Sequence, residues 1–343
     1  MPVTVVVGGQ YGSEGKGKVA YYLAQEKNAK IAVRVGGSNS GHTVYDEHGR
    51  KFIFRHLPTA SLLPDVVCVL PSGSYIDVHV LLTEIEKAEI APERLYIDPH
   101  AVLVTEKDKA EEHVSLKEKI GSTGSGTGAA VIRRIRRDNG MLFAQDEPLL
   151  QKYIQKTKPY MRENLQGGHR IIIEGTQGYG LSILHSDHYP YVTGRDTTAA
   201  GFVSETGLSP FDVDEIVLTI RAHPIRVGGN SGPLPYETDW ETVTLESGSN
   251  NDIIEYTSVT NKIRRVARFH PEVVRQAILT NNPTSIVLNH LDYIDARCCM
   301  DNHLTEKVCD YVRNIENLIG CSINFFGIGP ASFVKKGVLE CQI

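Results

Sequence analysis

A glycine-rich segment near the start of the chain has the residue types and spacing to bind and transfer a phosphate group. It reads Gly8-Gly9-Gln10-Tyr11-Gly12-Ser13-Glu14-Gly15-Lys16-Gly17-Lys18. In a turn between a strand and a helix, backbone N–H groups and the helix N-terminus point at a bound phosphate. The spacing from Gly12 to Lys18 is G-x-x-x-x-G-K, although Val19 stands where a magnesium-binding hydroxyl would follow. We therefore expect a P-loop-like phosphate loop.

A second glycine-rich segment, residues 36–43, contains His42. Its small polar residues could wrap a nucleotide, and an imidazole there could donate a proton to a developing phosphate charge. Taken alone, a single histidine after a glycine turn is more often structural.

Further polar or glycine-rich segments follow apolar runs along the chain. Several arginines follow the glycine-rich segment 120–128, and they suit a phosphate because a guanidinium presents a fork of donors. Cationic side chains near residue 264 suit a dicarboxylate substrate. These segments are 120–128, 174–178, 189–193, 226–229, 257–265, 288–292 and 327–330.

The elements that must position these segments alternate between strands and helices. Apolar, β-branched runs predict strands at 3–7, 31–35, 66–70, 95–97, 171–173, 216–220, 286–288 and 323–326. Helix-like segments lie at 78–87, 148–164 and 271–281. This alternation predicts an α/β fold with a largely parallel central sheet and flanking helices. In such sheets ligands bind at the carboxyl ends of the strands. No linker is evident, so we expect one elaborated domain over residues 1–343.

Composition limits the classes of partner. The formal net charge of −5 argues against a nucleic-acid-binding protein held by bulk electrostatics. The six cysteines show no C-x-x-C pair, so we expect reduced thiols rather than a disulfide framework or a zinc site. No apolar run reaches membrane length and no signal peptide is evident, so we expect a cytoplasmic protein with no membrane partner.

Read in order from Gly8 to Pro330, these motifs resemble those of the adenylosuccinate synthetase family. That family joins L-aspartate to a purine nucleotide through a 6-phosphoryl intermediate, with a nucleoside triphosphate and Mg²⁺. The resemblance implies that Ser13, Lys16 and His42 are catalytic, and that Ser13 and Gly41 hold the metal. The implied triphosphate site is Gly12, Ser13, Glu14, Gly15, Lys16, Gly17, Gly41, His42 and Thr43.

The resemblance also implies three further groups of binding residues. The acceptor nucleotide would contact Ser13, Asn39, Ser122, Thr123, Arg137, Gln177, Thr193, Val227 and Gly228. Aspartate would contact Val259, Thr260, Lys262 and Arg264, and the donor base would contact Asn289, His290, Asp292, Gly327, Gly329 and Pro330. In the family the arginine matching Arg137 crosses from a partner subunit, which implies a homodimer; Arg136 is the alternative.

Ser13 is the main departure from the family, which has its catalytic aspartate at this position. A serine hydroxyl is neutral at pH 7 and cannot be a comparable general base. The shorter side chain leaves room and an acceptor beside the purine C2 position, where guanine carries an amino group. Together with the short chain, this resembles phage-encoded members of the family that act on dGMP. We expect the product N6-succino-2-amino-2′-deoxyadenylate, a precursor of 2-aminoadenine DNA.

The donor-base site also departs from the family's motifs. His290 replaces a family lysine, and Ala331-Ser332 replaces an aspartate-arginine pair. We therefore expect ATP as donor, with dATP or GTP as alternatives. Three other functions stay open on the sequence: an ordinary adenylosuccinate synthetase using IMP and GTP, a non-catalytic purine nucleotide-binding protein, and a P-loop regulator.

Overall fold

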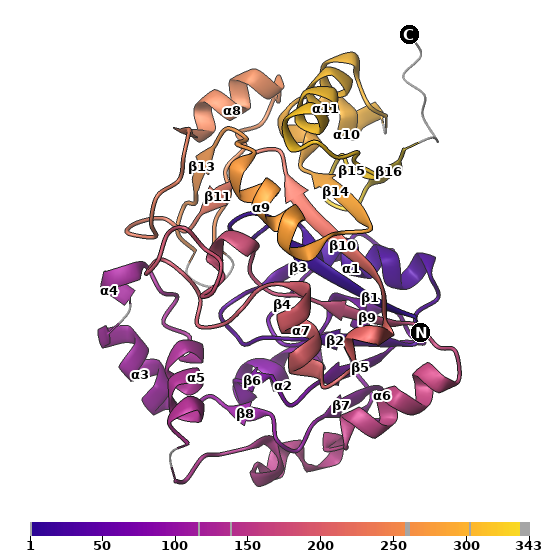
Figure 1. Ribbon diagram of the computed structural model, residues 1–343, viewed down its shortest axis with the longest axis vertical. Helices are drawn as coiled ribbons and strands as arrows, with labels where there is room; N and C mark the ends of the chain where they lie inside the picture. Colours follow the sequence, from indigo (N-terminus) through magenta and orange to yellow (C-terminus); the bar gives the residue numbers. More distant parts are fainter. Residues whose placement is uncertain (1, 116, 138, 258–260, 302, 337–343) are drawn as a thin grey trace.

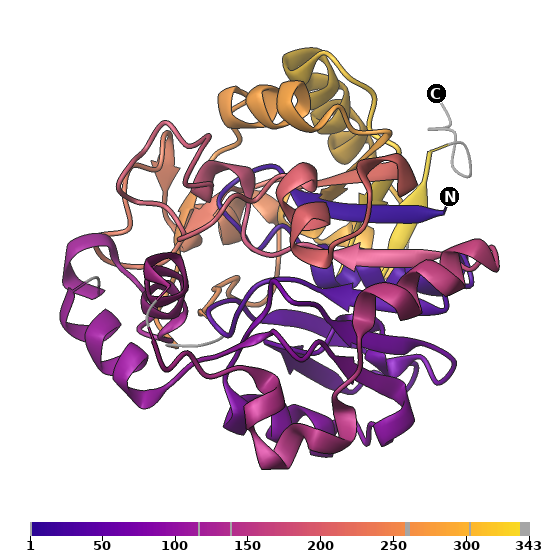
Figure 2. The ribbon, with the colours of Figure 1, turned by 60° about the horizontal axis from the view of Figure 1, so that its bottom comes forward.

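The computed structural model describes residues 2–115, 117–137, 139–257, 261–301 and 303–336, apart from the side chains of 117, 118 and 301. At the centre of these residues lies a nine-stranded sheet in the order β16-β15-β14-β10-β1-β9-β2-β5-β7 (Figures 1 and 2). Its neighbouring strands pair in parallel, except for the antiparallel β15 and β16. The predicted α/β fold with a largely parallel sheet is confirmed. The strands are β1 Val3–Gly8, β2 Ile31–Arg34, β5 Val67–Leu70, β7 Leu95–Ile97, β9 Ile171–Glu174, β10 Val213–Arg221, β14 Ser285–Asn289, β15 Phe325–Gly327 and β16 Phe333–Lys335.

Helices cover both faces of this sheet, which explains why its strands are apolar along their whole length. Along β1, Val5 and Val7 belong to a core built with α6, α7, α9 and α11. Val6 belongs to another core, built with α1. The helices are α1 Lys16–Glu26, α6 Thr157–Gln166, α7 Ala199–Thr206, α9 Glu272–Asn281 and α11 Glu306–Ile319.

The remaining helices and strands lie outside the nine-stranded sheet. The chain segment with α3, α4 and α5 lies on one side of the molecule, away from α10 and α11 (Figure 1). The remaining helices are α2 Val78–Lys87, α3 Glu106–Ser115, α4 Lys117–Ile120, α5 Thr127–Arg136, α8 Trp240–Ser247 and α10 Arg297–Asp301. The strands are β3 His42–Tyr45, β4 Lys51–Phe54, β6 Tyr75–Ile76, β8 Val102–Leu103, β11 Ile225–Arg226, β12 Glu237–Thr238 and β13 Arg265–Ala267. Seven short 3-10 helices complete the described part: Thr59–Leu62, Pro92–Arg94, Ala144–Asp146, Pro148–Tyr153, Tyr179–Leu181, Pro210–Asp212 and Leu291–Tyr293.

Two expectations are corrected. The helix expected over 148–164 is instead a 3-10 helix followed by α6, because Ile154 leaves the helical path to form a parallel bridge with Ile97. Cys309 is disulfide-bonded, whereas Cys68, Cys298, Cys299 and Cys321 are free, so the expectation that every thiol is reduced is wrong. Among the described residues, no helix is both long and apolar enough to cross a bilayer.

Candidate active site

The phosphate loop joins β1 to α1 and folds around the buried carboxylate of Glu14. Oε1 of Glu14 accepts hydrogen bonds from the backbone N–H groups of Gln10 (3.1 Å) and Gly12 (2.8 Å). Oε2 pairs with Lys16 Nζ at 2.6 Å, and both side chains are almost fully buried. Gly178 packs against this carboxylate so closely that a Cβ at position 178 would lie 2.3 Å from Glu14 Oε1. The loop shape is therefore set by an internal ion pair, and Glu14 neutralises Lys16 in this state.

Ser13 adopts the left-handed conformation, with φ at 57°. Gln177, at φ 60°, and His290, at φ 62°, share it. This conformation costs a non-glycine residue roughly 1–2 kcal/mol, and such strain gathers at functional sites. The carbonyl of Ser13 accepts a hydrogen bond from Arg221 Nη1 at 3.0 Å, which holds the strained turn in place.

His42 lies at the start of β3 in a buried network with Glu174 and Arg34. Its Nδ1 is 2.5 Å from Glu174 Oε1, and because a carboxylate can only accept, the ring proton sits on Nδ1; Arg34 Nη1 lies 2.5 Å from Nδ1 and 3.1 Å from Nε2. The backbone N–H of Thr59 donates to Glu174 Oε2 at 2.8 Å. Burial and the nearby Arg34 lower the pKa of His42 to about 3, against the opposing effect of Glu174. Burial raises the pKa of Glu174, but the His42 hydrogen bond and Arg34 outweigh it and keep the pKa low. His42 is therefore a neutral imidazole with a fixed tautomer.

A cavity of about 580 Å³ opens beside the phosphate loop. It lies at the carboxyl ends of the parallel strands, as expected for this fold class. Many of the predicted site residues line it, although they come from distant parts of the chain. These are Gly12, Ser13, Asn39, Gly41, Ser122, Thr123, Gln177, Thr193, Val227 and Arg264.

Some residues that line the cavity have buried polar atoms without a hydrogen-bond partner among the described residues. Thr123 Oγ1 is buried without a partner. Arg226 is almost fully buried, stacks 4.3 Å from the Tyr11 ring centroid, and leaves Nε and Nη2 unpartnered. Unmet buried polar groups are costly, and a bound ligand is one way to satisfy them.

Other predicted residues do not line this cavity. Arg137 is exposed at the end of α5, and its Nε lies 3.5 Å from the carbonyl of Ile135. Lys262 is exposed, and Val259 and Thr260 lie outside the described residues. The phosphate loop and β3 lie beside the cavity and contain Glu14, Gly15, Lys16, Gly17, His42 and Thr43. Gly228 packs against the backbone, where a Cβ would lie 2.5 Å from the Ile263 carbonyl.

The predicted donor-base residues gather next to the start of α1. Asn289 Nδ2 donates to the Glu14 carbonyl at 2.7 Å. Gly327 lies so close to Asn289 that a Cβ there would be 1.9 Å from Oδ1, and that oxygen has no partner. Lys18 Nζ donates to the carbonyl of Gly329 at 2.8 Å, beside Pro330. His290 and Asp292 follow β14 in the same region; burial lowers the pKa of His290 and raises the pKa of Asp292.

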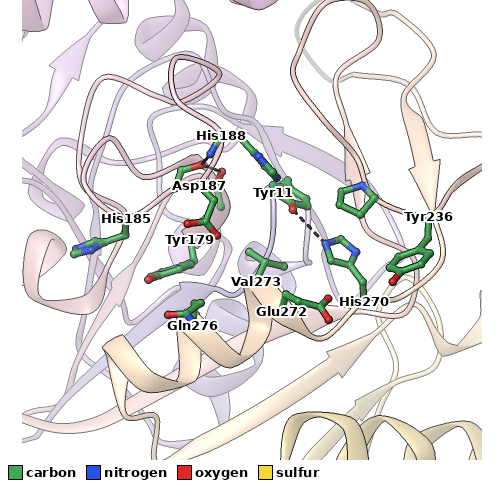
Figure 3. Close-up of a pocket in the computed structure, with 13 residues that line it drawn as sticks. Tyr11, Tyr179, His185, Asp187, His188, Tyr236, His270, Glu272, Val273 and Gln276 are labelled. Carbon is green, nitrogen blue, oxygen red and sulfur yellow. Dashed lines mark hydrogen bonds between the residues drawn. The ribbon is translucent and has the colours of Figure 1, made fainter.

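Tyr11 also lines a second pocket of about 310 Å³, which contains none of the predicted site residues in the described ranges (Figure 3). Its hydroxyl lies 3.2 Å from His270 Nε2, and Glu272 and Val273 of α9 form the floor (Figure 3). Tyr11 is therefore a wall shared by the two pockets.

The family model of adenylosuccinate synthetase matches residues 5–146 and 142–301. The chain belongs to the adenylosuccinate synthetase family. The adenylosuccinate synthetase of Methanococcus vannielii is 36% identical over 340 residues, which cover 96% of this chain and 97% of the relative. That of Methanocaldococcus jannaschii is 36% identical over 337 residues, covering 95% and 94%. The chain is thus a C–N bond-forming ligase that uses a nucleoside triphosphate, which confirms the predicted class of enzyme.

Two solved structures of this family are similar over nearly their whole length. The succinoaminodeoxyadenylate synthetase PurZ of cyanophage S-2L, bound to dGMP and to dATP as energy donor, has a TM-score of 0.82 and 30% identity. The similarity covers 97% of this chain and 95% of PurZ, and it confirms the predicted resemblance to phage members of the family. The fully ligated adenylosuccinate synthetase of Plasmodium falciparum has a TM-score of 0.83 at 20% identity, which shows a shared fold.

Sequence reasoning assigned no role to four charged residues that the structure places at the site: Arg34, Glu174, Arg221 and Glu255. Arg34 and Arg221 each end a buried strand and are themselves fully or almost fully buried. A charged residue at the end of an apolar run was the available signal, because a buried charge requires a partner.

Proposed function

We propose that this ligase joins L-aspartate to C6 of dGMP, with ATP, dATP or GTP as phosphoryl donor. O6 of guanine attacks the γ-phosphorus and the nucleoside diphosphate leaves. The aspartate amine then attacks C6, and inorganic phosphate leaves. The product is N6-succino-2-amino-2′-deoxyadenylate.

Ser13 is the observation that carries this proposal. It lines the cavity with Gln177 and Asn39, and it is a short neutral residue at the position where the family resemblance implies an aspartate. Glu112 is the one carboxylate among the described lining residues, and it accepts a hydrogen bond from Ser122 instead. Under this proposal the cavity beside Ser13 would offer space and a hydroxyl acceptor for a purine 2-amino group. The similarity to PurZ, which binds dGMP and dATP, supports this reading.

The surrounding residues fit the remaining steps of the proposal. Lys16 would leave Glu14 to pair with the donor phosphates, and Thr123 and Thr193 would bind the nucleotide 5′-phosphate. The neutral His42 holds a proton on Nδ1; the negative charge of the transferring phosphoryl group would favour its protonated form, so that it can act as an acid. Arg264, together with Lys262, would bind the dicarboxylate of aspartate.

Magnesium is the implied cofactor. Ser13 and Gly41 line the same cavity, and a serine hydroxyl and a backbone carbonyl are hard oxygen donors. They fit Mg²⁺, which usually keeps several waters and substrate phosphates as ligands. When bound, the ion would neutralise charge on the phosphates. Within the described residues, no three acidic, histidine or cysteine side chains form a metal cluster.

Phosphate release tests the proposal directly. Purified protein is assayed with Mg²⁺, L-aspartate and ATP, with dGMP and IMP side by side, and then with dATP and GTP. We expect aspartate-dependent turnover with dGMP and little with IMP. Comparable turnover with IMP would overturn the specificity argument.

An ordinary adenylosuccinate synthetase acting on IMP is the second candidate. The 36% identity to the methanogen enzymes favours it. In that case another group would have to supply the base that Ser13 lacks.

A further inference from the structure

Glu255 lies between two arginines that belong to different parts of the site. Its carboxylate forms a two-pronged ion pair with the buried Arg221, in which the Nη1–Oε2 distance is 3.3 Å. Its Oε2 is 3.8 Å from Nε of Arg264, the residue expected to bind aspartate. The hydroxyl of Tyr293 donates to Oε1 at 3.1 Å. One carboxylate thus connects the cavity-lining Arg264 to the interior of the protein.

The backbone reinforces this connection. The N–H of Arg264 donates to the Glu255 carbonyl at 2.9 Å, and the adjacent Tyr256 and Ile263 form an antiparallel bridge. Glu255 and Arg264 therefore lie on two paired segments, one before and one after residues 258–260, which are outside the described residues. Arg264 Nε donates to the Tyr256 carbonyl at 3.1 Å, and its Nη groups make no hydrogen bond to the described residues.

Arg221 anchors the carboxylate to the phosphate loop. Its Nη1 donates to the carbonyl of Ser13, and its backbone N–H donates to Gln10 Oε1 at 2.9 Å. Burial would raise the pKa of Glu255, but Arg221, together with His290 and Arg264, lowers it to about 2. The carboxylate is thus charged at every working pH and cannot move without leaving Arg221 unpaired, which is costly for a buried cation.

We propose that Glu255 is a positioning residue that holds the Arg264 guanidinium in the cavity for the aspartate carboxylates, with Arg221 and Tyr293 fixing its own place. The inference rests on the proposed function, in that Arg264 binds aspartate. Glu255 itself contacts neither the substrate nor the reacting atoms. Its loss should therefore weaken aspartate binding selectively.

The experiment compares Glu255→Gln with the matched control Glu237→Gln. Glu237 is the carboxylate partner of the neighbouring Arg265, with Nε–Oε1 at 2.7 Å, and does not line the cavity. Initial rates give separate KM values for aspartate, for the nucleotide and for the triphosphate. We expect Glu255→Gln to raise the KM for aspartate roughly tenfold or more, since the variant removes the negative charge that is paired with both Arg264 and the buried Arg221. The other two KM values should change less than about twofold, and the control variant should match the wild type.

A second variant covers the case in which Glu255→Gln does not fold. Tyr293→Phe removes one hydrogen bond to the carboxylate and leaves both charges paired, so the KM for aspartate should rise roughly two- to fivefold. An unchanged KM for aspartate in both variants, or an equal rise in all three KM values, would overturn the proposal. The assays use whichever purine nucleotide the wild type turns over. Failure of dGMP as substrate would therefore count against the proposed function without deciding this inference.

Discussion

Replacement of His42 by asparagine tests whether the imidazole is held neutral in the folded protein. An asparagine amide can still donate to Glu174, as Nδ1 of His42 does at 2.5 Å, but it cannot titrate. The folded pKa of His42 is about 3, against an ordinary value of 6.5. The unfolded chain therefore binds a proton more readily than the folded one, so stability is lost as the pH falls from 6.5 towards 3.

The size of this effect follows from the two pKa values. At pH 5.5 the unfolded histidine is mostly protonated while the folded one is neutral, which costs the wild type about 1.4 kcal/mol of unfolding free energy. At pH 7.5 the cost is close to zero. The difference in unfolding free energy between wild type and His42→Asn should therefore shift by about 1.4 kcal/mol between these pH values, in favour of the variant at low pH.

Urea unfolding at pH 7.5 and pH 5.5 measures this shift. His48→Asn is the matched control, because the His48 ring is 68% exposed and meets solvent in both states. If the difference between wild type and His42→Asn is the same at both pH values, the folded ring is free to take up a proton and the reasoning from burial is refuted. In phosphate release, His42→Asn should lose roughly 10²–10⁴-fold in turnover as the proposed acid is removed.

Four further outcomes are expected at other parts of the site. Ser13→Asp should fold, since aspartate tolerates the left-handed conformation, and should shift the kcat/KM preference from dGMP towards IMP by roughly tenfold or more in phosphate-release assays. Glu14→Gln leaves the buried Lys16 without its counter-charge and should lower the free energy of unfolding by ~3–5 kcal/mol in urea denaturation. Gly327→Ala places a Cβ 1.9 Å from Asn289 Oδ1, so the KM for the triphosphate should rise while the KM for the nucleotide stays the same. Arg137→Ala should raise the KM for the nucleotide, whereas Arg136→Ala should not; the reverse result would assign the phosphate contact to Arg136.

The sheet was predictable because its strands are buried on both faces. Each of the eight apolar runs corresponds to a strand of the main sheet, although the last begins at Phe325 instead of residue 323. Strand β16 was not predicted, because it has only three residues, Phe333 to Lys335, at the edge of the sheet, and its central residue alone is buried. The break near Ile154 was also missed, because it depends on pairing with a strand more than fifty residues away.

The walls of the candidate site could be predicted from short sequence motifs, whereas the ion pairs behind them could not, because they join residues far apart in the sequence. The glycines and small polar residues after each strand identified the walls of the cavity. The partners of Glu174 lie far from it in the sequence: Arg34 is 140 positions away and His42 is 132 positions away. No spacing rule connects such residues. The buried charge at the end of a strand shows only that some partner must exist.

The carboxylates around Ser13 bear on how the purine N1 proton leaves. Glu14 does not line the cavity, and its Oε1 accepts from the backbone N–H groups of Gln10 and Gly12. Glu174 is paired with Arg34 and His42, and Glu255 with Arg221; this pairing favours their charged forms and lowers their pKa values, which makes them weak bases. Glu112, the one carboxylate in the described lining, already accepts from Ser122. With serine at position 13, none of these groups takes the place of the family aspartate. Under the proposed function the N1 proton therefore leaves through water or through the bound aspartate, and the protein contributes by orienting the nucleotide and stabilising the phosphoryl charge.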